Sequence, residues 1–193
     1  MKRSFLALAL ALVIAGSSYA QTNWIFDRSH THVGFSVGYM MVSEVEGSFG
    51  SVYGNVTSKG DDFKGASVDI QIDATTIYTA DDGRDKHLKS ADFFDVTKYP
   101  NLLFKSTSLD INGKSVTLKG NLTIKNVTKP VVLKGNFGGV QKDPWGNTKA
   151  GFTLTGKINR QDFNVNWNKN LDGGGVVVGD EVDLIIKAVL IKK

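Results

Sequence analysis

Apolar and polar residues alternate along most of this chain, which is typical of β-strands that bury one face. The clearest case is residues 67–74, where Val68, Ile70 and Ile72 point one way and the intervening polar side chains point the other. Short connections separate the segments with this pattern, which are residues 32–39, 45–53, 67–74, 101–111, 115–124, 131–140, 151–160 and 181–191. The pattern therefore predicts an all-β fold of about eight strands.

Turn signals lie between these segments. Asn112-Gly113 favours a two-residue hairpin turn, since both central positions of a type I′ turn need positive φ. Residues 143–146, Asp-Pro-Trp-Gly, predict another turn, with Pro at its second position and Gly at its fourth. We see no linker or internal repeat, so we expect one domain, either a closed antiparallel barrel or a sandwich. Closure is the more favourable arrangement because it removes exposed strand edges.

The stretch GRDKHLKSADFFDVTKYP, residues 83–100, breaks the alternation. Thr79 with Asp82 three residues later fits a capping box, so the sequence predicts a short helix over residues 84–90 with Leu88 facing inward. We interpret the stretch as a helical insert that covers an opening of the barrel. Replacing its one Arg by Ala, Arg84→Ala, is then expected to weaken stability or the retention of any ligand held inside the barrel.

Two further helical turns are expected from the sequence. Ser90 can cap a turn that carries Phe93 and Phe94, and Pro100 ends the helical run before the next strand. Residues 39–43 could form one isolated turn between two strands.

Glycines share the apolar face of several predicted strands with large aromatic residues. The glycines on this apolar face are Gly47, Gly120, Gly135 and Gly156. A glycine inside a strand marks a bend or a close approach, as at barrel corners, and its missing side chain would also leave the interior more open. Because eight strands can enclose one ligand, the pattern predicts an apolar lumen suited to a long hydrocarbon.

A hydrocarbon ligand needs no specific polar contact. Burying each CH₂ is worth roughly 0.8 kcal/mol, so a chain of about 20 to 40 carbons could bind tightly despite its ordering cost. The candidate lining residues are the apolar residues at inward-facing strand positions, together with those of the helical insert. They are Val33, Phe35, Val37, Phe49, Ile70, Ile72, Leu88, Phe93, Phe104, Leu118, Leu122, Phe137, Phe152 and Leu154.

The first 20 residues are interpreted as a secretory signal peptide. Lys2 and Arg3 precede an apolar run over residues 5–16, and small residues at 18–20 suit cleavage after Ala20. The run is too short for a membrane-spanning helix, which needs about 20 residues. A retained N-terminal anchor is the alternative. We expect a periplasmic protein in which residues 21–193 form the barrel domain.

Composition changes this picture in two ways. Without Lys2 and Arg3 the net charge falls from +4 to +2, whereas nucleic-acid binding usually needs a strongly basic face. The chain has no Cys, so it has no disulfide, no lipoprotein anchor and no thiol chemistry. Stability must therefore come from the hydrophobic core.

Three histidines suggest an alternative, catalytic function. His30, His32 and His87 could together bind zinc, because three His and a water form a known catalytic arrangement. This would make the protein a metal- or His-dependent envelope hydrolase. The histidines lie in no HExxH-type motif, and we expect instead that His30 bonds beside Asp27 and that His32 lies at the surface.

Other catalytic patterns fit less well. Ser90, His87 and Asp85 are close in sequence but lack the GxSxG elbow of a hydrolase, and residues 173–175 lack the Lys-Ser/Thr of a phosphate loop. We expect no catalytic residue, no metal and no cofactor. Charged residues are interpreted as structural anchors, with Arg160 and Asp162 as an ion pair; these anchors are Asp27, His30, Arg84, Asp85, Arg160 and Asp162.

Several motifs together resemble the YceI-like family of exported proteins. The most specific is Arg-Asp-x-His-Leu at residues 84–88, followed by Phe-Phe-Asp-Val at 93–96 and Tyr-Pro at 99–100. The resemblance extends over essentially all of residues 21–193. It also includes Asp27, His30, Val33, Phe35, Val37, Met40-Met41-Val42-Ser43, Gly47, Phe49, Gly120, Leu122, Thr123, Ile124, Pro130, Asn159, Arg160, Asp162, Phe163 and residues 179–182.

The resemblance implies a lipocalin-like antiparallel barrel, partly closed by a helix, that holds a polyisoprenoid or another long lipid and has no catalytic residues. Two departures stand out. Gly38 and Tyr39 replace the Arg-His that the family often has before Met-Met, and Asn164 replaces a usual Gly. If the missing cation and imidazole contact a lipid head in relatives, the first departure would change head-group preference.

These observations lead to one expected function and two alternatives. We expect binding, storage or transport of a long isoprenoid-type lipid, such as a polyprenyl chain or a quinone tail, in the periplasm. The expected partners are this lipid and, transiently, a membrane or a membrane redox protein, with no nucleic acid. The protein is expected to be a monomer or a homodimer. The alternatives are the hydrolase and a packed structural or stress-response barrel without ligand.

Overall fold

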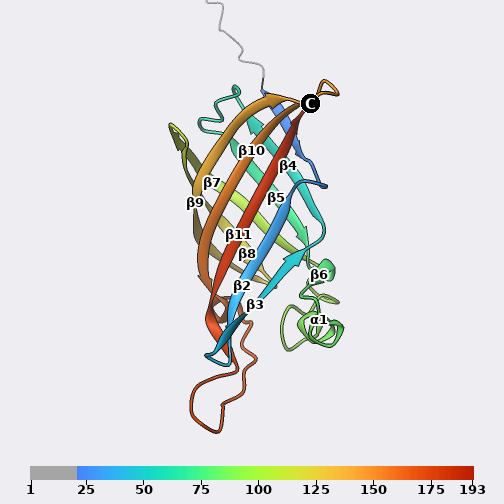
Figure 1. The fold of residues 1–193 in the computed structure, drawn as a ribbon, viewed down its shortest axis with the longest axis vertical. Helices are drawn as coiled ribbons and strands as arrows, with labels where there is room; N and C mark the ends of the chain where they lie inside the picture. Colours follow the sequence, from blue (N-terminus) through green and yellow to red (C-terminus); the bar gives the residue numbers. More distant parts are fainter. Residues whose placement is uncertain (1–20) are drawn as a thin grey trace, which may run out of the picture.

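The computed structural model describes residues 21–193, so the expected signal peptide lies outside the described residues. The chain forms an elongated barrel with one α-helix at its side (Figure 1). The elements are β1 (Thr22–Phe26), β2 (His32–Tyr39), β3 (Ser43–Phe49), β4 (Val52–Ser58), β5 (Ser67–Asp73), η1 (Ala74–Thr76), β6 (Ile77–Tyr78), α1 (Asp82–Lys89), β7 (Asn101–Asn112), β8 (Ser115–Ile124), β9 (Val127–Lys142), β10 (Thr148–Asn159), η2 (Arg160–Phe163) and β11 (Val178–Lys192).

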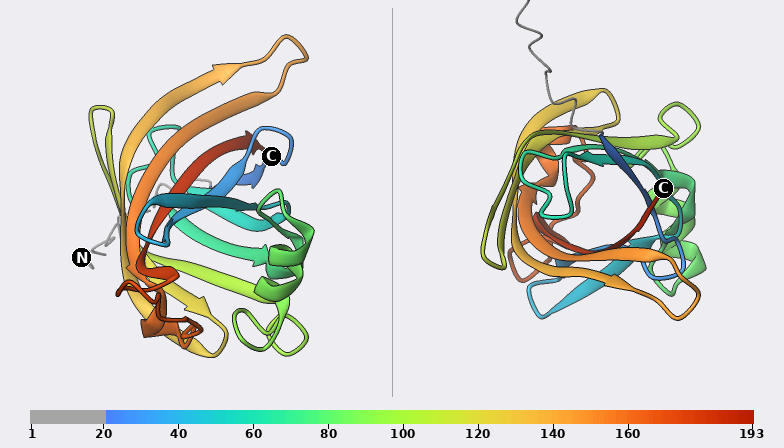
Figure 2. Two further views of the ribbon diagram at one scale, coloured as in Figure 1. Left: turned by 60° about the horizontal axis from the view of Figure 1, so that its bottom comes forward. Right: turned by 90° about the horizontal axis from the view of Figure 1, so that it is seen from above.

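Eight antiparallel strands close into a ring. Their order is β1-β4-β5-β7-β8-β9-β10-β11, and β11 returns to β1 through the pairs from Trp24↔Lys192 to Phe26↔Leu190. The view along the barrel shows the closed ring (Figure 2, right). The predicted closed antiparallel barrel is therefore confirmed. We call the end with the C-terminus the upper end and the end with α1 the lower end (Figure 1).

The lower half of the barrel is built differently. The fifteen-residue β11 pairs with β1 near its C-terminus, but with β2 over Val182–Lys187. Beyond β2 the sheet continues through β3 to the two-residue β6, which has no second strand partner among the described residues. The segment after β6 forms α1, which lies beside the lower half of the barrel (Figure 1). The helical insert thus lies where the sheet ends.

One predicted strand is in fact two. The segment 45–53 is divided into β3 and β4, which pair with different neighbours. The cause is the hydroxyl of Thr76, which accepts hydrogen bonds from the backbone N–H groups of Gly50 (3.0 Å) and Ser51 (3.2 Å). The bend shifts the alternation, so Val52 is buried whereas Tyr53, which an unbroken alternation from Val45 would place on the inner face, is 45% exposed.

The turn predictions had mixed outcomes. The turn at residues 143–146 is confirmed, since Gly146 N–H bonds to the Asp143 carbonyl at 3.0 Å. The hairpin near Asn112 is confirmed with a shifted loop. Asn112 pairs with Ser115, so Gly113 and Lys114 form the loop, and of these two residues only Gly113 has positive φ (59°).

The helical turn predicted at residues 39–43 is wrong. β2 extends to Tyr39, and the chain reverses through Met40 and Met41, whose φ angles of 51° and 59° are left-handed. The N–H of Val42 bonds to the Tyr39 carbonyl at 3.2 Å. This segment is therefore a tight hairpin turn between β2 and β3.

Helix α1 has a different cap from the predicted capping box. The carboxylate of Asp81 accepts a hydrogen bond from the N–H of Arg84 at 2.7 Å and so is the N-cap. Thr79 bonds to Asp85 instead. The turn after the helix agrees with the prediction, because the carbonyl of Ser90 accepts the N–H of Phe93 at 3.1 Å. Within residues 21–193 we find no helix long and apolar enough to cross a membrane.

The inward glycines are sites of close approach rather than empty space. A Cβ on Gly47 would collide with the ring of Phe35 on the paired strand, and one on Gly120 would collide with the ring of Phe104. The interpretation that these glycines open the interior is therefore wrong at both positions. Each glycine instead leaves room for a neighbouring phenyl ring.

Candidate functional site

Two adjoining chambers occupy the interior of the barrel. The upper chamber has a volume of about 140 Å³, and the lower chamber one of about 470 Å³. The lower chamber alone falls in the range of roughly 300–1,000 Å³ that is common for ligand pockets. The two chambers meet at six residues that line both, which are Phe35, Phe49, Leu102, Ile124, Ile158 and Leu184.

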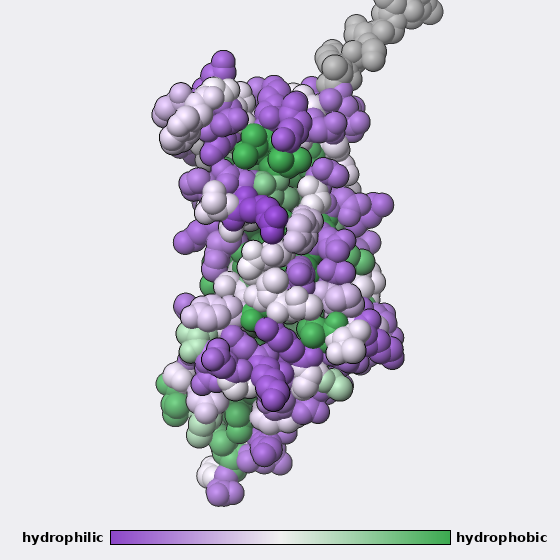
Figure 3. Space-filling model, turned by 90° about the vertical axis from the view of Figure 1, so that its right-hand side faces the viewer, coloured by the Kyte–Doolittle hydropathy of each residue, from purple (hydrophilic) through white to green (hydrophobic). Residues whose placement is uncertain are grey.

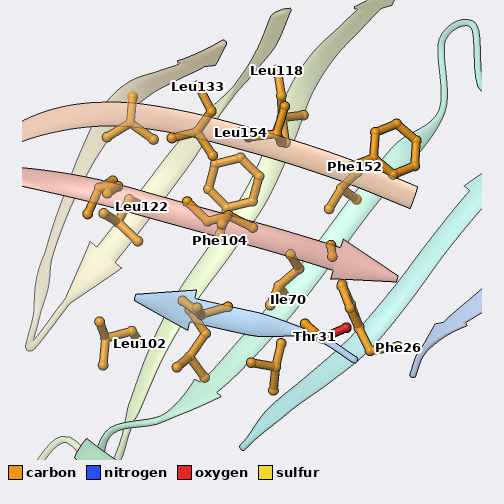
Figure 4. Close-up of a pocket in the computed structure, with 18 of the residues that line it drawn as sticks. Phe26, Thr31, Ile70, Leu102, Phe104, Leu118, Leu122, Leu133, Phe152 and Leu154 are labelled. Atoms are coloured by element: carbon orange, nitrogen blue, oxygen red, sulfur yellow. The ribbon is translucent and has the colours of Figure 1, made fainter. Parts of the chain in front are cut away.

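The upper chamber is lined almost entirely by hydrocarbon. Its wall consists of Val, Leu, Ile, Phe and Ala side chains with Gly34, and among residues 21–193 Thr31 supplies its only polar side chain. Figure 4 shows Ile70, Phe104 and Leu122 among the side chains that extend into the lumen. The alternation of apolar and polar residues along each strand produces this wall, because every second side chain points inward. A polar group placed there would find almost no partner.

Aromatic packing closes the upper end. Phe63, from the loop between β4 and β5, is fully buried and packs on Trp24 (centroid distance 4.7 Å) and Phe152 (5.1 Å). The Nε1–H of Trp24 donates to the hydroxyl of Ser58 at 3.0 Å, which satisfies its one polar group. Sequence reasoning missed Phe63, although a lone Phe within the polar run SKGDDFKGAS was an available signal.

The lower chamber has aromatic walls with a few polar side chains. Leu88 of α1 and Phe93 and Phe94 of the following turn face it. The rings of His87, Phe93 and Trp167 lie within 4.9–5.3 Å of one another. Among the described residues, four side chains with polar groups line it, which are Tyr39, Arg84, His87 and Arg160. The alternation in NVNWN, residues 164–168, was an overlooked signal for Val165 and Trp167.

Thirteen of the fourteen predicted lining residues lie in a chamber wall. Val33, Ile70, Ile72, Phe104, Leu118, Leu122, Phe152 and Leu154 line the upper chamber, Val37, Leu88 and Phe93 line the lower, and Phe35 and Phe49 line both. Phe137 lies in neither wall. It pairs with Phe152 across β9 and β10, stacks on its ring at 4.9 Å and packs on Phe63 at 5.6 Å, so it belongs to the aromatic packing at the upper end.

Other lining residues were not predicted. Val52 and Val56 of β4 were missed because the bend at Gly50 changes the parity. Phe26, Val68, Leu102, Leu109, Ile124, Val131, Leu133, Ile158, Leu184, Ile186, Ala188 and Leu190 also line the upper chamber. Most of them continue inner faces that the alternation already indicated.

Asp27 and His30 connect β1 to the neighbouring strands. The buried Asp27 carboxylate accepts hydrogen bonds from Lys149 of β10 (2.7 Å), His30 (2.9 Å) and Ser29 (2.8 Å). Burial alone favours the neutral carboxyl, but these bonds, that of Lys149 first, hold the pKa of Asp27 well below its usual range. The same contact raises the pKa of Lys149.

Arg84 and Asp85 attach the helix to the end of the sheet. Thr79, directly after β6, donates its N–H and its hydroxyl to the buried Asp85 carboxylate, at 2.8 and 2.5 Å. Arg84 donates from Nε to the Thr79 hydroxyl at 2.8 Å and from Nη2 to the Thr79 carbonyl at 2.6 Å. Both side chains therefore contact one residue at the strand end.

Arg160 forms a different ion pair from the predicted one. Its Nη2 lies 3.2 Å from the carboxylate of Asp180, whereas the exposed Asp162 forms no ion pair within the described residues. Burial lowers the pKa of Arg160 and the Asp180 carboxylate opposes this effect. The guanidinium also donates to four backbone carbonyls, those of Val165, Trp167, Val178 and Gly179.

The three histidines do not converge on one point. His30 bonds to Asp27, His32 lies exposed at the start of β2, and His87 bonds to Asp92 at 2.9 Å. In the part of the chain that the structure describes, no group of three His, Cys, Asp or Glu is placed to hold a metal ion.

A hydrolase triad of Ser90, His87 and Asp85 also has the wrong geometry. The hydroxyl of Ser90 donates to the backbone carbonyl of His87 at 2.7 Å. The imidazole bonds to Asp92, and the carboxylate of Asp85 bonds to Thr79. Nothing in this arrangement joins the three side chains in the order that a nucleophile and its base require.

Comparison with known proteins agrees with this architecture. A model of the YceI-like domain matches residues 24–190. Protein YceI of Shigella flexneri is 37% identical over 189 residues, which cover 96% of each chain. The crystal structure of a Campylobacter jejuni YceI protein is 32% identical, with a TM-score of 0.68, and the match covers 86% of this chain and 96% of that one.

A more distant structure shares the fold alone. It is described as a polyisoprenoid binding domain from Saccharophagus degradans, and it is 13% identical with a TM-score of 0.64, over 88% of this chain and 98% of that one. The closed barrel, the side helix and the match along residues 24–190 lead to one conclusion. This chain belongs to the YceI-like family.

Proposed function

We propose that this protein binds a long isoprenoid-type lipid and stores or carries it in the periplasm. The observation that supports the proposal best is the pair of adjoining chambers, of which the upper has Thr31 as its only polar side chain. An isoprenoid chain or a quinone tail matches such a wall because it needs no hydrogen-bond partner. The distant Saccharophagus degradans structure described as a polyisoprenoid binding domain has the same fold.

The energetics favour a long chain over a short one. Each buried CH₂ contributes roughly 0.8 kcal/mol, whereas the cost of immobilising a ligand includes a large part that does not grow with its length. Affinity therefore rises with every carbon that the cavity can hold. The elongated cavity, rather than any single residue, would set the preferred length.

Transfer of such a lipid requires contact with a membrane. The β2–β3 turn at the lower end exposes Met41 (75%) and Val42 (83%), and the adjacent Tyr39 lines the lower chamber. Figure 3 shows hydrophobic surface toward this end, and another hydrophobic patch near the upper end, on a face that also carries many hydrophilic residues. We propose that this turn contacts the membrane surface transiently when the lipid enters or leaves.

The test fills the cavity without changing the outer surface. Ile70 faces the upper chamber, and its neighbour Gln71 is exposed on the outside of β5. We expect Ile70→Trp to lower the amount of co-purified lipid, because the indole occupies the space of the chain, and Gln71→Trp to leave it unchanged. Native mass spectrometry followed by organic extraction measures the bound lipid. Wild-type protein that carries no lipid, and takes up none from isoprenoid vesicles, would refute the proposal.

A further inference from the structure

The two chambers differ in polarity in a way that gives a bound lipid a direction. Within residues 21–193 the upper chamber offers the polar side chain of Thr31 alone, whereas the lower chamber contains those of Tyr39, Arg84, His87 and Arg160. A polar head group in the upper chamber would lose its hydrogen bonds with water and gain almost none in return. The head is therefore stable only at the lower end.

Arg160 cannot be the residue that receives the head. A guanidinium has five N–H donors, and those of Arg160 all have partners. Nε donates to the Gly179 carbonyl, Nη1 to the carbonyls of Val165 and Trp167, and Nη2 to the Val178 carbonyl and the Asp180 carboxylate. Arg160 therefore shapes the chamber wall but has no donor left for a ligand.

Arg84 differs from Arg160 because some of its N–H donors have no partner within residues 21–193. Its Nε and one Nη2 proton go to Thr79. Within residues 21–193 its Nη1 has no hydrogen-bond partner, and no carboxylate lies within 4.0 Å of the guanidinium, although the side chain lines the lower chamber. Arg84 thus presents unused, permanently charged donors. Such donors prefer phosphoryl and other anionic or strongly polarised oxygens.

Aromatic rings flank this position. The rings of His87 and Trp167 are edge-on at 4.9 Å, and Phe93 lies 5.3 Å from Trp167. The Nε2 of His87 is held by Asp92. The chamber therefore combines a donor at Arg84 with apolar ring faces, which suits a compact head carried on an apolar chain.

We infer that the lower chamber holds the polar head of the lipid, with a phosphoryl or quinone carbonyl oxygen hydrogen-bonded to Arg84 and the isoprenoid chain extending up to Phe63. The inference rests on the proposed lipid-binding function and adds to it the direction of the ligand and the chemistry of its head. Phosphate monoesters and quinones share this acceptor chemistry, and the experiments below distinguish them.

The position of the head can be tested with the native tryptophans. Trp24 and Trp145 belong to β1 and the β9–β10 turn at the upper end, and Trp167 faces the lower chamber. A long-chain ubiquinone bound head-down should quench the fluorescence of Trp167. We expect quenching to persist in Trp145→Phe and to disappear in Trp167→Phe, with retained ubiquinone verified by extraction. Quenching that survives in Trp167→Phe, or is absent in ubiquinone-loaded wild type, would overturn the inference.

The role of Arg84 can be tested with lipids that differ only at the head. Dissociation constants are compared for squalene, which has no head, for undecaprenyl phosphate and for ubiquinone. We expect Arg84→Gln to raise the dissociation constant of at least one of the two lipids with a polar head by about tenfold or more. The dissociation constant of squalene should not change. If the affinity falls only for undecaprenyl phosphate, the group that Arg84 binds is a phosphoryl group. If it falls only for ubiquinone, that group is a quinone carbonyl.

Two results would contradict the role of Arg84. An equal loss for squalene would mean that Arg84 only attaches the helix to Thr79, and unchanged constants for all three lipids would mean that it contacts no head. Wild-type protein that binds none of the three lipids would instead refute the proposed function itself. The failure of the inference and the failure of the function are thus separate outcomes.

Discussion

Asp27 and Arg160 are both buried charges, and each is compensated by a complete set of partners. Asp27 receives three hydrogen bonds, one of them from Lys149 on another strand. Arg160 donates all five of its N–H groups. Removing one partner from such a set leaves a desolvated charge, which is usually far more costly than the net value of the contact. Single residues therefore fix how the barrel closes at β1 and at the start of β11.

Asp27 should make stability depend on pH. Because its folded pKa is depressed, its contribution is present above the unfolded value of about 3.9 and is lost as the pH falls below it. We expect Asp27→Asn to destabilise the protein by about 1–2 kcal/mol at pH 7, or about 2–4 °C in Tm per kcal/mol.

Thermal unfolding of both proteins from pH 7 to pH 2 provides the measurement. The difference in Tm between wild type and Asp27→Asn should shrink as the pH falls below about 4. Asp162→Asn is the matched control, since Asp162 is exposed and forms no ion pair among residues 21–193. A difference that stays constant down to pH 2 would contradict this role of Asp27.

At the scale of elements, α1 is held by few contacts. Thr79 connects it to β6 by accepting from Arg84 and donating to Asp85, while Leu88, Phe93 and Phe94 cover the lower chamber. A segment with so few polar attachments is expected to open at lower free energy than the barrel strands. The insert is therefore the element best suited to move when a lipid passes.

Thr79→Val should loosen this cover without changing its shape. The substitution removes the hydroxyl that accepts a hydrogen bond from Arg84 and donates one to Asp85. We expect the free energy of local opening of α1 to fall by about 1–3 kcal/mol. Hydrogen exchange of the α1 amides should accelerate, together with lipid release. Thr75→Val, which alters an exposed hydroxyl contact with Asp73, is the control. Unchanged exchange in α1 of Thr79→Val would show that Thr79 does not hold the helix.

For the whole molecule, the sequence predicted the barrel and most of its wall. Alternation alone places Ile70 and Ile72 inside, because burial of one sheet face requires a period of two. The alternation did not predict the break between β3 and β4 at Gly50, since the hydroxyl that bends the chain there comes from Thr76, 26 residues away.

Long-range contacts explain the other differences. Arg160 pairs with Asp180 rather than the nearby Asp162, and Phe63 reaches the upper core from a polar loop. Phe137 packs on Phe63 and Phe152 at the upper end rather than in a chamber wall. Parity predicts which face a residue occupies, but not the bulges and loop residues that tertiary packing selects.

In the proposed complex, one apolar chain occupies both chambers. The most direct test is a crystal structure of the protein purified with its native ligand. We predict continuous electron density for a single methyl-branched chain that begins beside Arg84 in the lower chamber, passes between Phe35 and Ile124 and ends below Phe63. Chambers that contain only ordered water, or that are filled by repacked side chains, would contradict it.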